Sequence, residues 1–152
     1  MPKHQHPTAR FPHLLPWDAA IWRSFLELNG HDYQSFEYDV RVGDGRDPGP
    51  EYTQNIRNMA IQLSQRRIDA VGFQPGTITL FEITGSIGMT ALGQCHAYPI
   101  LYRLKNPGNY TLRIILVAAH LQDDIQTSLV ARQIPFALFP DVKPPQTPTE
   151  RR

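Results

Sequence analysis

The segment from residue 67 to residue 84 constrains the fold more than any other part of the sequence. It holds two apolar stretches, RIDAVGF and TITLFEIT, separated by Gln74-Pro75-Gly76. Proline followed by glycine suits the central positions of a β-turn, so the segment predicts an antiparallel hairpin. If the turn is centred on Pro75-Gly76, facing residues have numbers that sum to 151, as 75 and 76 do.

This register places two carboxylates opposite one another. Asp69 faces Glu82, and Arg67 faces Thr84. The Cβ atoms of directly opposed residues lie about 4.5–5.5 Å apart, so we expect the two acids to meet at one spot between otherwise apolar strands. Strand alternation puts Glu82 and Thr84 on the same face of the hairpin.

Two like charges at this distance destabilise a fold unless something offsets them. Three arrangements are open. A divalent metal can bridge the carboxylates, which suits hard oxygen ligands and Mg²⁺ or Mn²⁺ chemistry on phosphates. A shared proton can neutralise one of the acids and raise its pKa. Alternatively, Arg67 can close an internal ion cluster with both acids.

The remaining chain alternates between helical and strand patterns. Asp18 is a plausible N-cap for a helix that ends at Asn29-Gly30, and Pro99 should kink or split the helix expected over 86–105. The spacing of the apolar residues predicts elements in the order α, β, (α), β, β, α, β, α, β, where the bracketed helix covers 53–65. Besides the hairpin, the predicted strands are FEYDVRV (36–42), LRIILVAAH and IPFALF, and DDIQTSLVARQ is predicted as a helix. This order indicates a mixed sheet flanked by helices on both faces. We expect Gly88 and Gly93 to allow a helix to approach the sheet closely.

Length and charge narrow the possible functions. At 152 residues with 41% hydrophobic residues, the chain suits a single domain with a real core. The net charge of +1 excludes a globally cationic nucleic-acid coat, and the single cysteine excludes a disulfide scaffold or a Cys-rich zinc module. No apolar run is long enough for a membrane span, and the start lacks the apolar core of a signal peptide. We therefore expect a soluble protein, neither secreted nor in a membrane.

Proline-rich segments lie at both ends of the sequence. We interpret 1–15 as a flexible N-terminal arm, 16–140 as the domain and 141–152 as a C-terminal tail. Histidines in the arm, namely His4, His6 and His13, are interpreted as solvated rather than metal-binding.

Consecutive segments of the chain are R-I-D-A-V-G-F, a turn, I-T-L-F-E-I-T and a helix bearing G-Q-C-H-A-Y. In this order they resemble the core of the PD-(D/E)XK nuclease superfamily. This resemblance implies an α/β fold with a three-layer, restriction-endonuclease-like core. It implies that Asp69 and Glu82 are the two metal-binding acids, helped by the backbone carbonyl of Ile83. Gln94 and Tyr98 match the Gln-x-x-x-Tyr pair of the recombination-exonuclease branch. They are expected either to orient a substrate phosphate or a metal-bound water, or to form hydrogen bonds under the sheet. Glu27 is a weaker candidate for the additional acid of the family.

One position departs from the family pattern. Thr84 stands where the family has its catalytic lysine. Arg67 could supply positive charge there but could not act as a base, because an arginine keeps its proton. Losing one preorganised electrostatic group typically costs a factor of about 10²–10³ in rate. Lys105 is not expected to reach the site, and Cys95 and His96 are interpreted as packing residues.

Two functions follow from the resemblance. The first is a degenerate nuclease fold that serves as a structural or assembly component of a tailed-bacteriophage virion, in the neck, head or tail. It would have no cofactor, and its proline-rich tails would bind other virion proteins or further copies of the chain. The alternative is a weak DNA endo- or exonuclease that uses Mg²⁺ or Mn²⁺. The protein would then reside in a virion or in the host cytoplasm.

Overall fold

A five-stranded mixed sheet forms the body of the protein. The computed structural model describes residues 11–146. Strand order in the sheet follows the chain: β1 (Ser35–Val42), β2 (Arg66–Gln74), β3 (Thr77–Ile87), β4 (Thr111–Leu121) and β5 (Phe136–Leu138). β1, β2 and β3 pair antiparallel, whereas β3, β4 and β5 run parallel.

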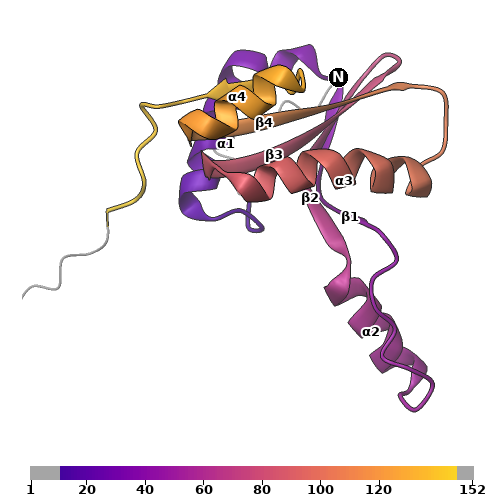
Figure 1. Ribbon diagram of the computed structural model, residues 1–152. Helices are drawn as coiled ribbons and strands as arrows, with labels where there is room; N and C mark the ends of the chain where they lie inside the picture. The colour runs from indigo at the N-terminus through magenta and orange to yellow at the C-terminus, as the bar shows by residue number, and fades with distance from the viewer. Residues whose placement is uncertain (1–10, 147–152) are drawn as a thin grey trace, which may run out of the picture.

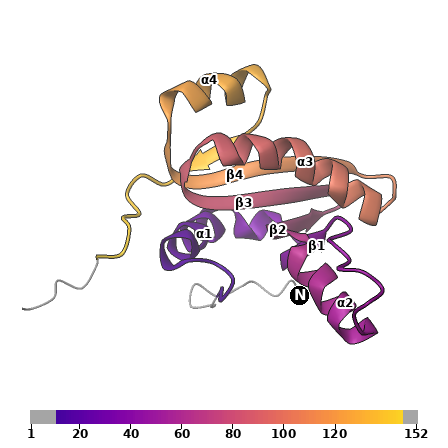
Figure 2. The ribbon, with the colours of Figure 1, turned by 60° about the horizontal axis from the view of Figure 1, so that its bottom comes forward.

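Helices cover both faces of this sheet. In the described part of the chain the α-helices are α1 (Pro16–Asn29), α2 (Gln54–Ser64), α3 (Met89–Lys105) and α4 (Asp123–Ala131), and a short 3-10 turn (Gly30–Asp32) follows α1. Figure 2 shows α1 on one side of the sheet and α3 and α4 on the other. The predicted element order and the three-layer α/β architecture are therefore confirmed. None of the helices within residues 11–146 has the length and apolar character to cross a bilayer.

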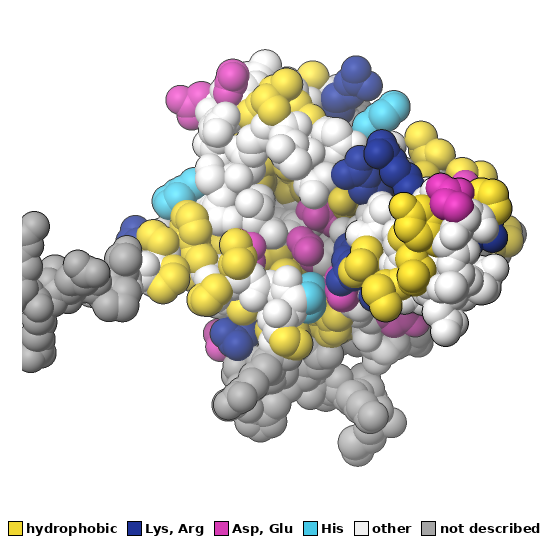
Figure 3. Space-filling view, turned by 90° about the horizontal axis from the view of Figure 1, so that it is seen from below, with side chains coloured by type: hydrophobic (Ala, Val, Ile, Leu, Met, Phe, Trp, Pro, Cys, Tyr) yellow, Lys and Arg dark blue, Asp and Glu magenta, His cyan; other side chains and the backbone are white. Residues whose placement is uncertain are grey.

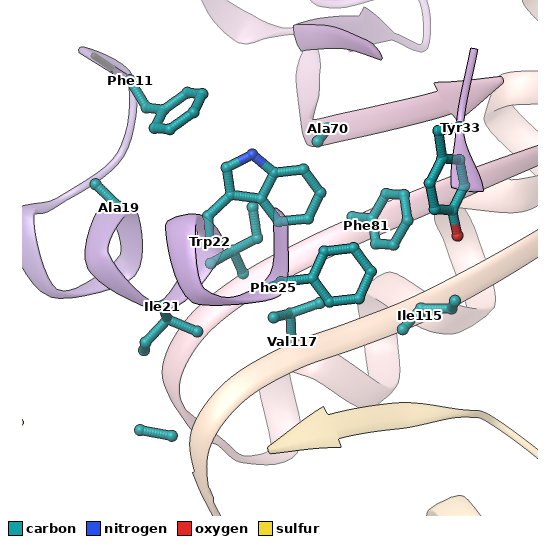
Figure 4. Packing of buried hydrophobic residues seen from close by; sticks show 12 residues of the cluster. Phe11, Ala19, Ile21, Trp22, Phe25, Tyr33, Ala70, Phe81, Ile115 and Val117 are labelled. Atoms are coloured by element: carbon teal, nitrogen blue, oxygen red, sulfur yellow. The ribbon is translucent and has the colours of Figure 1, made fainter. Parts of the chain in front are cut away.

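Aromatic side chains fill the layer between α1 and the sheet (Figure 4). The Trp22 side chain is fully buried, and its ring stacks on that of Phe25 with 5.0 Å between centroids. The ring centroid of Phe81, from β3, lies 5.1 Å from the ring centroid of Trp22. The burial of these large aromatic side chains is the main force that holds α1 against the sheet.

The β2–β3 hairpin has the predicted register. Its paired residues include Ala70 with Phe81 and Gln74 with Thr77, and in each pair the two residue numbers sum to 151. Gly76 has φ of +69°, the left-handed conformation that the second central residue of a type II turn requires. The turn thus fixes which side chains face each other along the two strands.

Several local expectations were wrong. The N-cap of α1 is Leu15, with Pro16 at the first helical position, whereas Asp18 lies inside the first turn. Of the two outcomes expected at Pro99, a kink or a split, the split does not occur, because helix α3 is continuous from Met89 to Lys105. The closest approach occurs at Gly85, where an added Cβ would lie 2.2 Å from the Trp17 ring. An added Cβ at Gly88 would lie 3.3 Å from the side-chain amide of Gln122, and one at Gly93 would meet nothing within 4 Å.

The segments next to the described termini are packed on the body. Phe11, which we assigned to a flexible arm, is 6% exposed and belongs to the core under α1. The indole N–H of Trp17 donates to the carbonyl of Val142 at 2.9 Å, and Val142 packs against the same core. Residues 11–15 therefore belong with the domain, and so does Val142. Residues 143–146 are described and exposed, whereas 1–10, which include His4 and His6, and 147–152 lie outside the described residues.

Helix α2 projects away from the sheet, as Figure 1 shows. The predicted helix is present, but none of its residues is buried, and Ile56, Met59 and Leu63 are 49–70% exposed. We call residues 43–65 the arm from here on, which is distinct from the predicted N-terminal arm (1–15). The amide of Gln65 donates to the carbonyl of Gly43 at 2.8 Å and closes the arm at its base.

Candidate functional site

A polar cleft opens where β2 and β3 separate beside the N-terminal end of α3. Its volume is about 600 Å³. Figure 3 shows acidic side chains at the bottom of a hollow, with Lys and Arg side chains close by. The predicted site residues that line the cleft are Arg67, Asp69, Glu82, Ile83, Thr84 and Gln94.

Asp69 and Glu82 bind each other's strands across the hairpin. The backbone N–H of Ile83 donates to Oδ2 of Asp69 at 2.9 Å, and the backbone N–H of Asp69 donates to Oε1 of Glu82 at 3.3 Å. The two carboxyl groups also share a hydrogen bond. The hairpin register therefore brings the two acids together as the sequence predicted.

Burial dominates the electrostatics of this pair. Glu82 is 4% exposed, and the loss of hydration raises its pKa to about 9, with the charge of Asp69 adding to the effect. Burial also raises the pKa of Asp69, while the Ile83 N–H and the nearby charge of His13 oppose that shift. The pair therefore shares one proton at neutral pH when no cation is bound, which is the second of the three arrangements considered above.

Arg67 does not complete an ion cluster with these acids, so that interpretation was wrong. Its Nη1 lies 3.0 Å from Oδ2 of Asp39 on the neighbouring strand β1. Both partners are about one-third exposed, at 38% and 33%. Arg67 nevertheless lines the cleft that contains the acid pair, and its ion pair within the described residues is with Asp39 and not with either acid.

The two residues of the predicted helix pair have different surroundings. Gln94 lines the cleft and hydrogen-bonds to Tyr98, one turn further along α3. Burial raises the pKa of the Tyr98 hydroxyl, and the charge of Glu82 raises it further, which puts Tyr98 within electrostatic reach of the acid pair. Gln94 therefore lines the cleft together with Asp69 and Glu82, whereas Tyr98 is buried in the core and does not line the cleft.

Other predicted residues have different positions. The Oγ1 of Thr84 donates to the Ser86 carbonyl at 3.4 Å, a neutral contact at the position of the family's lysine. Lys105 is at the far end of α3, where its ammonium donates to the carbonyl of Arg41. Cys95 is buried in the core, as predicted, but His96 is exposed rather than packed.

Two residues near the site were not identified from the sequence. His13 Nε2 lies 3.0 Å from the backbone carbonyl of Asp69. Asp18, at the start of α1, hydrogen-bonds to the backbone of Gly85, and both burial and the charge of Asp69 raise its pKa. Glu27, the acid we had selected on this helix, is exposed and makes no such contact in the described part of the chain. No local pattern could have shown this, because the approach depends on how α1 crosses β3.

The donor set fits a small hard cation. Asp69, Glu82 and the Ile83 carbonyl offer only oxygen ligands, and Mg²⁺ is commonly held by one or two carboxylates while keeping several waters. Within residues 11–146 no three acidic, His or Cys side chains gather in a metal-binding arrangement. A cation at this place would therefore depend on the two acids, one backbone oxygen and water.

Comparisons with known proteins give one structural relative. No family model matches the chain, and the search of curated proteins found no match. A solved structure described as a repair endonuclease from Pyrococcus abyssi is similar, with a TM-score of 0.43 and 18% sequence identity. The match covers 83% of this chain and 47% of the endonuclease, so the chain spans about half of the length of that protein.

Proposed function

We propose that the cleft binds a divalent cation and a nucleic-acid phosphodiester, and that it hydrolyses the phosphodiester slowly. The observation that carries this proposal is the buried pair of Asp69 and Glu82 in an open polar cleft. Neither carboxyl has an ion-pair partner among residues 11–146. Without a bound cation the pair keeps a proton, and a buried acid in a cleft whose pKa is raised so far is a candidate for a functional site.

The surrounding residues suit a phosphate group. When bound, Mg²⁺ or Mn²⁺ supplies Lewis-acid polarisation of a phosphate and activation of a water. Asp69 and Glu82 would hold that ion, and the side-chain amide of Gln94 would donate to a phosphate oxygen or to a bound water. Arg67, on the wall of the cleft, offers a planar cation that pairs well with phosphate. This arrangement supports kinship with PD-(D/E)XK nucleases.

Thr84 sets the expected rate. The hydroxyl is neutral and already donates to a backbone carbonyl, so it neither stabilises developing negative charge nor accepts a proton as the family's lysine would. We therefore expect cleavage about 10²–10³ times slower than a comparable site with a lysine there.

A plasmid-nicking assay in Mn²⁺ tests this proposal. The wild type should nick supercoiled DNA, Asp69→Asn should lose the activity, and Glu27→Gln should retain it, because Glu27 is an exposed acid away from the cleft. Titration calorimetry with Mn²⁺ on the same three proteins measures cation binding separately. The proposal is wrong if wild type and Asp69→Asn bind Mn²⁺ equally and nick equally.

An assembly role in a bacteriophage virion is the second candidate. The exposed apolar face of the arm favours it, since Ile56, Met59 and Leu63 are left uncovered within the described chain. We would expect the chain to be a stoichiometric component of purified particles from the phage that encodes it. Mass spectrometry of such particles measures this, and absence of the chain from them would exclude the assembly role without affecting the nuclease proposal.

A further inference from the structure

The ladder between β1 and β2 is interrupted beside the acid pair. Tyr38 pairs with Ala70 and Val40 pairs with Ile68, yet Asp39 and Asp69 between them do not pair. Asp39 has φ of +52°, in the left-handed region that residues other than glycine rarely adopt. The interruption therefore coincides with a strained backbone at one residue.

The position of Asp39 also matters for the local charge. A regular strand would place Asp39 directly opposite Asp69, adding a third carboxylate at a cross-strand distance of about 4.5–5.5 Å. Instead, the Asp39 carboxylate accepts from Arg67, two residues before Asp69 on β2. Asp39 still contributes a small rise to the pKa of Asp69, so the two acids remain neighbours.

The Asp39–Arg67 pair gives little stability in return for this strain. Both side chains are about one-third exposed, and ion pairs of that kind contribute little to the folded state. Strained residues that persist without a stability benefit cluster at functional sites. The contact engages Nη1 of Arg67 only, so in the described chain the donors on Nε and Nη2 are free for a second acceptor.

We propose that Asp39 is a positioning residue that holds the Arg67 guanidinium at the wall of the cleft, where it receives a phosphate of a DNA strand lying over the acid pair. This inference rests on the proposed function and assigns how the phosphate is recognised. Asp39 itself touches no substrate. It fixes one edge of the guanidinium fork so that the other edge faces the cleft.

A double-mutant cycle tests the coupling between the two residues. The measurement is the affinity for a fluorescein-labelled DNA duplex in Ca²⁺, by anisotropy, for wild type, Asp39→Asn, Arg67→Gln and the double variant. Asparagine also tolerates positive φ, so the backbone conformation is kept. Each single variant should bind about tenfold more weakly and lower the salt slope by about 1, because one phosphate contact is lost. The double variant should bind no more weakly than Arg67→Gln, because the effect of Asp39 acts through Arg67.

Asp47→Asn is the matched control. It breaks a second Asp–Arg pair, that of Asp47 with Arg57 on the arm, and should leave the affinity unchanged. Asp39→Gly, which relieves the positive φ, replaces Asp39→Asn if that variant does not fold, and should show the same loss of affinity.

Each outcome decides between the two proposals. The positioning role is overturned if Asp39→Asn binds as tightly as the wild type or tighter, or if it weakens binding equally when Arg67 is already replaced. In both cases the proposed function stands. If the wild type does not bind the duplex at all, the proposed function fails and the positioning role fails with it.

Discussion

Replacing Glu82 with glutamine should make the protein more stable at alkaline pH. The buried glutamate has a pKa of about 9, so the folded protein keeps this proton over a range in which the unfolded chain has released it. For an acid whose pKa is raised by folding, stability is complete below the unfolded pKa of about 4.5 and is lost as the pH rises toward 9. The amide is neutral at every pH and its N–H can donate to Asp69 in place of the shared proton.

The size of the effect follows from proton linkage. One proton difference between the folded and unfolded states changes the free energy of unfolding by about 1.4 kcal/mol per pH unit. Between pH 5 and pH 8 the wild type therefore loses at most about 4 kcal/mol through this group, and we expect about 2 kcal/mol because Asp69 adjusts its own ionisation. A loss of about 2 kcal/mol lowers the Tm of a chain of this length by about 4–8 °C.

Thermal denaturation between pH 5 and pH 8 measures the difference, with Glu27→Gln as the exposed control. The Tm of wild type and control should fall over this range, whereas that of Glu82→Gln should change much less. At pH 8, Mn²⁺ at about 100 times its Kd should stabilise the wild type by about 2.7 kcal/mol and the variant by clearly less. Equal pH slopes for wild type and Glu82→Gln would refute the reasoning, because the burial of Glu82 would then carry no proton linkage.

Three further substitutions have defined outcomes. Thr84→Lys should increase the Mn²⁺-dependent nicking rate by about 10²-fold, and an unchanged rate would mean that the side chain at this position does not reach the scissile phosphate. Gly85→Ala should destabilise the protein by about 1–3 kcal/mol in urea denaturation, because the added Cβ would lie 2.2 Å from Trp17, and a change below about 0.5 kcal/mol would contradict this packing. Arg67→Ala should cost less than about 1 kcal/mol, since its pair with Asp39 is partly exposed, and a loss above about 3 kcal/mol would instead indicate a buried ion cluster.

The hairpin and its acids could be predicted from the sequence because one short turn determines them. Pro75-Gly76 centres the turn, the register follows, and the position of Asp69 opposite Glu82 follows from the register. The layer order was also predictable, since each helix and strand carries its own apolar period. These are local patterns whose outcome depends little on distant residues.

Features that depend on packing between distant elements could not be predicted. His13 and Asp18 approach Asp69 only because α1 crosses β3 where Gly85 leaves room for Trp17. The positive φ at Asp39 and the pairing of its carboxylate with Arg67 are likewise not indicated by the alternating pattern of a regular strand. For α2, the period showed which side is apolar but not that the described chain leaves this side uncovered.

The arm joins two strands that are already neighbours in the sheet. Because β1 and β2 pair antiparallel and Gln65 is bonded to Gly43 at the point of exit, the residues between them contribute nothing to the connectivity of the body. A hairpin turn of two to five residues would close the same gap. This position is therefore a natural place for insertions and deletions to accumulate during evolution, and a practical one for grafting a foreign helix without altering the strand pairing around Asp69.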